Sequence, residues 1–187
     1  MVIINIITSQ DKKFNVGSKT KAEILDSPRS ALGKQKNNTY IIAMEDRTKK
    51  IEYKLIPHAA DICIEVEEPT LKKLFDKAAS AVTEQMVGID RINKKITKDI
   101  AIIAQDKDLL LVYWLQEILY HFYVHGLIYI GSKIKKLNNV GFKAEVVFNR
   151  FNPEEHVAKR EIKAVTYHDI HIKKIGKKYR VKFVIDV

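Results

Sequence analysis

The chain has 187 residues, of which 46% are hydrophobic, and this length suits one domain with its own core and is short for two. The formal net charge of +10 attracts anions such as RNA, phosphates or acidic protein surfaces, although plain solubility explains it equally well. A single cysteine excludes an internal disulfide, and no stretch is typical of a membrane span or a signal peptide. We therefore expect a cytoplasmic protein with no membrane partner.

Residues 1–50 differ from the rest of the chain. They contain clusters of turn-forming residues without a sustained period, and they hold ten basic and five acidic residues. We expect a basic, disordered N-terminal extension, or a start placed too far upstream, in front of a domain over residues 51–187. The run Gly17-Ser-Lys-Thr20 lacks the earlier glycine of a phosphate-binding loop, so it predicts no nucleotide site.

The domain begins with a strand and a helix. Residues 62–66 alternate apolar and polar side chains, which is typical of a half-buried strand. Thr70 is a suitable helix N-cap, and apolar residues at helical spacing follow it as far as Gly88, which we expect to end the helix. Residues 96–104 then predict one or two strands.

The second half predicts another helix and a series of strands. Asp106 is placed to cap a helix from about Lys107 to Val124, apolar nearly all round, which Gly126 ends. The strands predicted after it cover residues 127–135, 142–148, 161–175 and 179–187. This order predicts an α+β fold, in which two helices pack on a largely antiparallel sheet in a single domain.

Three segments carry polar groups where a regular strand does not need them. They are His58-Ala-Ala-Asp61, Lys163-Ala-Val-Thr-Tyr-His168 and the final pair Asp186-Val187. A chain that ends in a regular strand holds its terminal carboxylate in place, next to that of Asp186. If Asp61 lies beside them, three acidic groups repel one another, and a bound cation offsets the repulsion. Oxygen ligands favour Ca²⁺, Mg²⁺ or Mn²⁺. The simpler interpretation has no metal site: Asp61 forms a turn, and Asp186 faces solvent.

Five short motifs stand in a fixed order between Tyr53 and Val187. They are His58-Ala-Ala-Asp-Ile62, Thr70-Leu-Lys-Lys-Leu-Phe75, Asp108-Leu-Leu-Leu-Val-Tyr-Trp-Leu115, Lys163-Ala-Val-Thr-Tyr-His168 and Asp186-Val187. Together they resemble the archease family, and although each motif is weak alone, five in register are specific. Two positions depart from the family pattern: Ala59 replaces a usual Thr, and Asn149 stands where Gly often precedes a turn, a place that tolerates Asn in a left-handed conformation.

The resemblance implies an accessory protein rather than an enzyme. Archeases promote the GTP-dependent RNA ligase of tRNA splicing, which seals a cyclic-phosphate end to a hydroxyl end through a guanylylated histidine. The implied metal ligands are Asp61, Asp186 and the terminal carboxylate of Val187, with calcium the expected ion. The resemblance also places three residues near them on the activating surface, His58, Lys163 and His168. The implied partner is the tRNA-splicing ligase, with RNA as an indirect partner.

Two other functions are compatible with the same residues. Converging carboxylates with a Lys and a His also suit a metal-dependent phosphohydrolase or nuclease, although a second acidic pair for a two-metal site is missing. The positive charge also suits a chaperone-like module that binds RNA or protein. Metal-dependent cleavage of RNA by the isolated protein would favour the first alternative, and salt-sensitive RNA binding without an effect on the ligase would favour the second.

Overall fold

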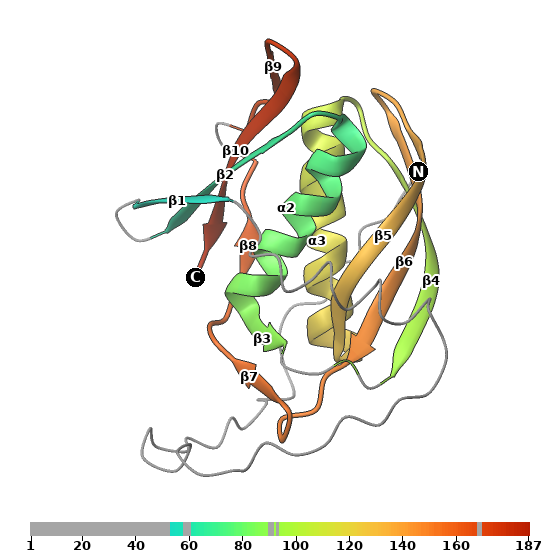
Figure 1. Ribbon diagram of the computed structural model, residues 1–187, viewed down its shortest axis with the longest axis vertical. Helices are drawn as coiled ribbons and strands as arrows, with labels where there is room; N and C mark the ends of the chain where they lie inside the picture. Colours follow the sequence, from blue (N-terminus) through green and yellow to red (C-terminus); the bar gives the residue numbers. More distant parts are fainter. Residues whose placement is uncertain (1–52, 58–60, 90–91, 93, 168–169) are drawn as a thin grey trace, which may run out of the picture. The chain divides into compact units, whose positions relative to one another are not determined.

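A computed structural model describes most of the chain after residue 52. The described segments are residues 53–57, 61–89, 92, 94–167 and 170–187. The predicted extension over residues 1–50, and both His58 and His168, lie outside them. Within these segments, two helices stand between two sheets of antiparallel strands (Figure 1). Neither of the described helices has the length and hydrophobicity of a membrane span.

The larger sheet holds β1, β2, β10 and β8 in that order, and β9 pairs with the first residues of β10. Every neighbouring pair is antiparallel. The strands cover Lys54–Pro57 (β1), Ile62–Glu68 (β2), Ala164–Val165 (β8), Lys173–Ile175 (β9) and Lys178–Asp186 (β10). The apolar face predicted for β2 is confirmed, because Ile64 and Val66 are fully buried, but Cys63 and Glu65 on the other face are also only 9% exposed.

A second sheet has three strands in the order β4, β6 and β5, and β3 pairs with β7 in a separate two-stranded ribbon. These strands cover Val87–Ile89 (β3), Lys95–Ile103 (β4), Leu127–Leu137 (β5), Gly141–Arg150 (β6) and His156–Ala158 (β7). β4 is a single strand over the region where one or two were predicted. The β3–β7 ribbon was not predicted.

The two helices are α2, over Leu71–Met86, and α3, over Lys107–His125. Thr70 caps α2, because its Oγ1 accepts a hydrogen bond from a first-turn backbone N–H at 3.2 Å. Asp106 caps α3 in the same way through Oδ1, at 2.7 Å. Both predicted caps are therefore confirmed.

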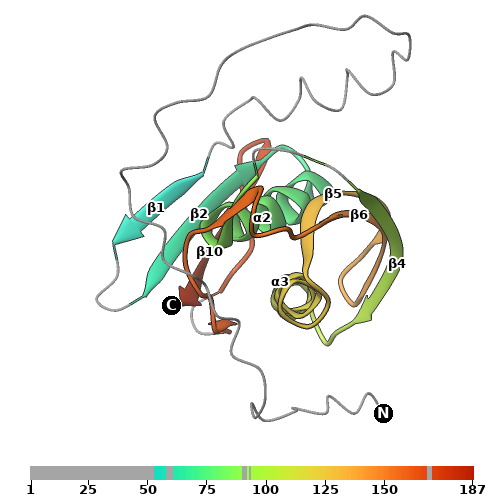
Figure 2. The same cartoon turned by 90° about the horizontal axis from the view of Figure 1, so that it is seen from below.

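The helices form the middle layer of the domain (Figure 2). α2 contacts β2 and β10 on one side and β5 on the other, while α3 contacts β8 on one side and β4 and β5 on the other. This placement explains why α3 is apolar nearly all round, since sheets flank it on two sides. The Nε1–H of the fully buried Trp114 in α3 donates to the carbonyl oxygen of Phe75 in α2 at 3.0 Å. The predicted α+β class is confirmed.

The end of α2 differs from the prediction. The helix ends at Met86, before Gly88, because Val87 is extended with φ −149° and ψ 138°. The backbone N–H of Val87 still donates to the carbonyl oxygen of Thr83, so the last turn is closed without a glycine. Gly88 instead lies in β3, paired with Val157 of β7.

The single long strand predicted over residues 161–175 is wrong. Its two ends pair with the two ends of β10, as β8 and β9, whereas the described residues 170–172 before β9 lie outside the ladder. Ile172 is buried, and its backbone N–H donates to Oδ1 of Asp108 at 2.9 Å. At Ile172 the backbone therefore bonds to the first turn of α3 and not to a neighbouring strand.

Asn149, which replaces a frequent Gly of the family before a turn, is a strand residue. It lies inside β6 and is fully buried. Its Oδ1 accepts a hydrogen bond from the Lys94 backbone N–H at 3.1 Å, and its Nδ2 is 3.1 Å from Nε2 of His156. The amide thus ties β6 to the segments that precede β4 and open β7.

The residue that follows α3 gives a stability prediction. Gly126 has φ +62° and ψ +38°, and a Cβ there would meet no atom within 4 Å. Gly126→Ala therefore adds backbone strain without a clash and should lower the free energy of unfolding by about 1 kcal/mol. Urea unfolding followed by circular dichroism measures it. The control Gly126→Asn should lose less free energy of unfolding, because Asn tolerates this conformation. An Ala variant as stable as the parent would contradict the prediction.

Candidate functional site

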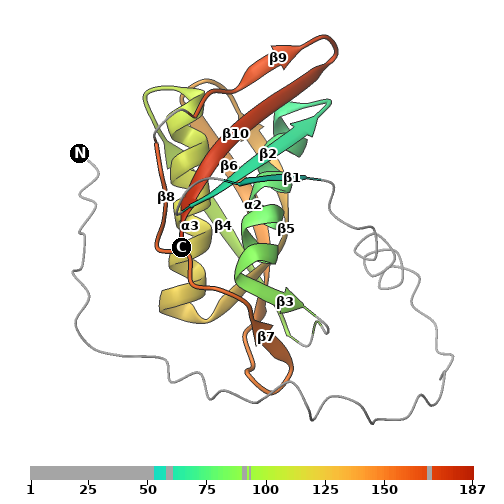
Figure 3. The same cartoon turned by 90° about the vertical axis from the view of Figure 1, so that its left-hand side faces the viewer.

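The last strand is held in the sheet up to its end. Ile185 pairs with Ile62 of β2 on one side and with Val165 of β8 on the other, and Asp186 pairs with Ala164. β10 is therefore a central strand at its C-terminal end (Figure 3). The terminal carboxylate of Val187 stands one residue beyond the last pair, as the sequence predicted for a chain that ends in a regular strand.

Lys163 faces the two residues at this end. Its backbone N–H donates to the carbonyl oxygen of Asp186 at 2.8 Å. Its Nζ lies 3.0 Å from the terminal oxygen of Val187 and 3.9 Å from Oδ1 of Asp186. The side chains of Lys163 and Asp186 are 58% and 47% exposed, so this group of charges is accessible from solvent. The structure thus brings together three of the predicted site residues.

Asp61 stands at the same end of the sheet. It directly precedes Ile62, and Ile62 pairs with Ile185, the residue before Asp186. The two aspartates therefore lie one residue beyond the last pair of two adjacent antiparallel strands. Among the described residues, no hydrogen-bond donor or cation contacts the Asp61 carboxylate, so nothing there offsets its charge.

The chemistry of these groups suits a divalent cation. The carboxylates of Asp61, Asp186 and the terminus, with the ammonium of Lys163, carry two net negative charges. Every donor is an oxygen, which Ca²⁺, Mg²⁺ and Mn²⁺ prefer. In the described segments, no three side chains of His, Cys, Asp or Glu are grouped closely enough to hold a metal ion. A site at this end therefore requires the terminal carboxylate of Val187 as its third acidic ligand.

Two side chains that were not predicted as site residues position the Lys163 segment. The hydroxyl of Tyr123 in α3 accepts a hydrogen bond from the Ile162 backbone N–H at 2.8 Å, directly before Lys163. Burial raises the pKa of Tyr123, which keeps the hydroxyl neutral. Asp108 holds the other end of the segment through the Ile172 N–H, and its Oδ2 lies 2.9 Å from Nδ1 of His171. Nothing in the helix pattern distinguishes these polar groups from solvent-facing ones.

Cys63, which precedes Ile64 in β2, is a structural residue. It is 9% exposed, and burial raises the pKa of its thiol, because the thiolate loses solvation. Cys63 therefore behaves as a small apolar side chain of β2. His58 and His168, the other two residues predicted for the activating surface, lie outside the described residues.

Comparison with known proteins identifies the chain's relatives. The sequence model of the archease protein family matches residues 53–187. Protein archease of Pyrococcus furiosus is 34% identical over 121 residues, which are 63% of this chain and 85% of the relative. Protein archease of Sulfolobus acidocaldarius is 32% identical over 136 residues, which are 72% of this chain and 98% of the relative.

A solved structure supports the fold. The solution structure of Methanobacterium thermoautotrophicum protein 1598 superposes with a TM-score of 0.57 at 22% identity, covering 74% of this chain and all of that one. The family match spans well over half of the sequence, including β2, both helices and β10. The chain therefore belongs to the archease family.

Proposed function

We propose that this protein activates the GTP-dependent RNA ligase of tRNA splicing, acting in the cytoplasm as an accessory protein and not as a catalyst itself. It would promote guanylylation of the ligase and repeated joining of cyclic-phosphate and hydroxyl RNA ends. Membership of the archease family supports this role. The observation that carries the proposal is the ordered end of β10, which holds the carboxylates of Asp186 and Val187 within reach of Lys163.

The metal part of the proposal concerns Asp61, Asp186 and the terminal carboxylate of Val187. These groups would hold a divalent ion, with Ca²⁺ expected and Mg²⁺ or Mn²⁺ as alternatives. When bound, such an ion supplies positive charge that stabilises negative charge on a phosphate. β2 and β10 keep the carboxylates at one end of the sheet, so the site needs little reorganisation when a partner docks.

Lys163 has a separate role in this proposal. Its ammonium offsets part of the repulsion between Asp186 and the chain terminus. Its side chain is more than half exposed, so it is also available to an acidic or phosphate group of the ligase. We propose that His58 and His168 belong to the same activating surface.

The test mixes the purified full chain with its cognate ligase, GTP, a divalent metal and an RNA pair with cyclic-phosphate and hydroxyl ends. We expect faster guanylylation of the ligase and more turnovers per ligase molecule than without the protein. Unchanged guanylylation and turnover would overturn the proposal. RNA cleavage by the isolated protein with metal would favour a nuclease or phosphohydrolase, and a rise only in soluble ligase would favour a chaperone.

A further inference from the structure

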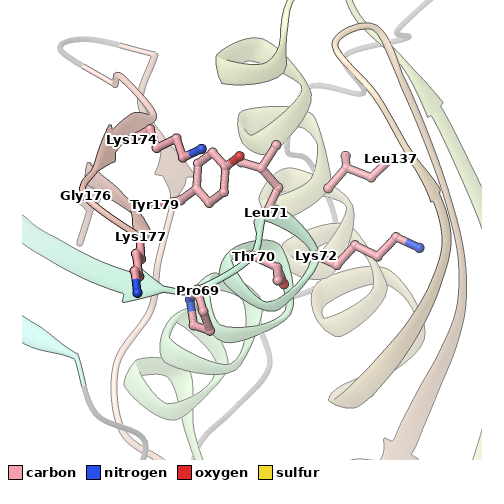
Figure 4. A pocket seen from close by; sticks show the side chains of 9 residues that line it. All are labelled: Pro69, Thr70, Leu71, Lys72, Leu137, Lys174, Gly176, Lys177 and Tyr179. Atoms are coloured by element: carbon pink, nitrogen blue, oxygen red, sulfur yellow. The ribbon is translucent and has the colours of Figure 1, made fainter.

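A hollow of about 640 Å³ lies at the end of β10 that is remote from the C-terminus (Figure 4). Three elements contribute to it: the start of α2, the end of β5 and the β9–β10 hairpin. The residues that matter for its chemistry are Leu71, Lys72, Leu137, Lys174, Lys177 and Tyr179. No Asp or Glu is among the nine residues that line it, so the hollow is positively charged.

The three lysines of this groove have no acidic partner within the part of the chain that the structure describes. The Nζ of Lys72 lies 3.4 Å from a carbonyl oxygen, that of Lys135. The Nζ of Lys174 lies 5.9 Å from the centre of the Tyr179 ring. These ammonium groups, with that of Lys177, are therefore available to an anionic ligand.

Neighbouring cations contrast with these lysines. Lys178 and Arg180 of β10 are both paired with Glu67, at 2.9 and 2.6 Å. Lys77 of α2 is paired with Glu68. The acidic residues of β2 thus neutralise the cations beside the groove and leave those inside it uncompensated.

The first turn of α2 places positive charge where a helix disfavours it. Lys72 and Lys73 both lie in that turn, which contains no acidic residue. The N-terminal end of a helix carries partial positive charge, so basic side chains there lower helix stability. A sequence that breaks a local rule without an evident structural gain points to a functional requirement at that place.

The groove combines these cations with a flat aromatic ring and apolar walls. Tyr179, Leu71 and Leu137 are each partly buried against the core, and Leu71 lies beside the Tyr179 side chain (Figure 4). Single-stranded nucleic acids are bound by this combination, because bases stack on aromatic rings while lysines contact the phosphates. An acidic peptide would use the lysines but would gain less from the ring. We propose that this groove binds a single-stranded segment of RNA, with a base against Tyr179.

This groove, the hollow lined by Lys72, Lys174, Lys177 and Tyr179, is separate from the acidic end of the sheet. Tyr179 and Asp186 are seven residues apart on β10, which is about 23 Å at the rise of a strand. RNA bound in the groove would leave the carboxylates free for a protein partner. This inference goes beyond ligase activation and does not depend on it, because the groove residues and the proposed metal ligands do not overlap.

The test measures binding of the full chain to a fluorescent single-stranded RNA of about ten nucleotides, without ligase or metal. Lys72→Gln, Lys174→Gln and Lys177→Gln together should weaken binding at least roughly tenfold. Each phosphate contact contributes a slope of about 0.7 to the dependence of log K on log salt for single strands. The triple variant should therefore lower that slope by about 2.

Matched variants separate the groove from general charge. A control triple variant combines Lys98→Gln, Lys133→Gln and Lys143→Gln, which removes the same amount of charge from the three-stranded sheet. This variant should keep most of its affinity for the RNA. An equal loss in both triple variants would overturn the proposal. Tyr179→Phe should bind as the parent does and Tyr179→Leu several-fold more weakly. If a polyglutamate peptide binds as tightly as RNA and Tyr179→Leu changes neither, an acidic protein is the partner and the RNA proposal fails.

A stability measurement guards against loss of fold. Because Lys72 opposes the dipole of α2, Lys72→Gln should keep or slightly raise the melting temperature while it weakens RNA binding. Misfolding would instead lower both. Weaker binding with a clearly lower melting temperature in each groove variant would therefore count against a direct role of these lysines.

Discussion

Adding a short Gly-Ser tail after Val187 is expected to abolish ligase activation, with a loss of at least roughly tenfold. The tail converts the terminal carboxylate into a neutral amide. The oxygen that lies 3.0 Å from Nζ of Lys163 then no longer carries charge, and the proposed metal site loses its third acidic ligand. Asp186→Asn should have an effect of similar size, because it removes a neighbouring carboxylate without changing the shape of the side chain. Guanylylation of the ligase, measured with labelled GTP, reports both variants.

The controls for this experiment use charge changes elsewhere. The same tail placed before Met1 should leave activation intact. Asp99→Asn removes an acid from β4, where Asp99 pairs with Lys135 at 2.9 Å, and should also leave activation intact. Circular dichroism must show that the tailed chain and Asp186→Asn remain folded. Full activation by both of these variants would exclude the C-terminal end as the activating site.

Trp114→Ala is expected to lower the free energy of unfolding by about 3–5 kcal/mol, a large share of the stability of an ordinary domain. Trp114 is fully buried, and its ring centre lies 4.6 Å from that of Phe142 and 5.8 Å from that of Tyr129. Truncation opens a cavity between α3 and the three-stranded sheet, and it also removes the hydrogen bond to Phe75. Urea unfolding must be followed by circular dichroism, since Trp114 is the only tryptophan of the chain.

Trp114→Phe is the matched control. It keeps an aromatic ring in the core but loses the Nε1–H donor, so we expect a cost of about 1–2 kcal/mol. A small and equal loss for Ala and Phe would mean that the ring is not packed between the helix and the sheet. A much larger loss of unfolding free energy in Trp114→Ala than in Trp114→Phe would support the packing of the middle layer described above.

Local pattern was sufficient for the two helices, for several of the longer strands and for much of the core. Thr70 and Asp106 cap the two helices as predicted, because an N-cap depends on one side chain and the turn that follows it. The alternation around Ile64 predicted which face of β2 is buried, since side chains on a strand point to opposite sides in turn. The chain-terminal strand was also visible in the alternation from Tyr179 to Val187.

Which strands pair with one another could not be inferred from the sequence in the same way. The sequence pattern predicts one strand over residues 161–175, yet Ile172 lies outside the ladder, and its backbone N–H donates instead to Asp108 of α3, 64 positions away in the sequence. Periodicity reports which side of a segment is buried, but not which strand it pairs with. Asn149 illustrates the same limit, because its buried amide is explained only by the neighbours that it contacts, Lys94 and His156.

By itself the sequence determined the two capped helices, the strand faces and the family motifs, because each depends on residues close together in the chain. Only the tertiary structure decided that Asp61 stands beside the end of β10, although 125 positions separate it from Asp186. Only the tertiary structure also gathered Lys72, Lys174 and Lys177 around one hollow. Both arrangements depend on strand register and helix packing, which are set by long-range hydrogen bonds and core contacts that no local pattern contains.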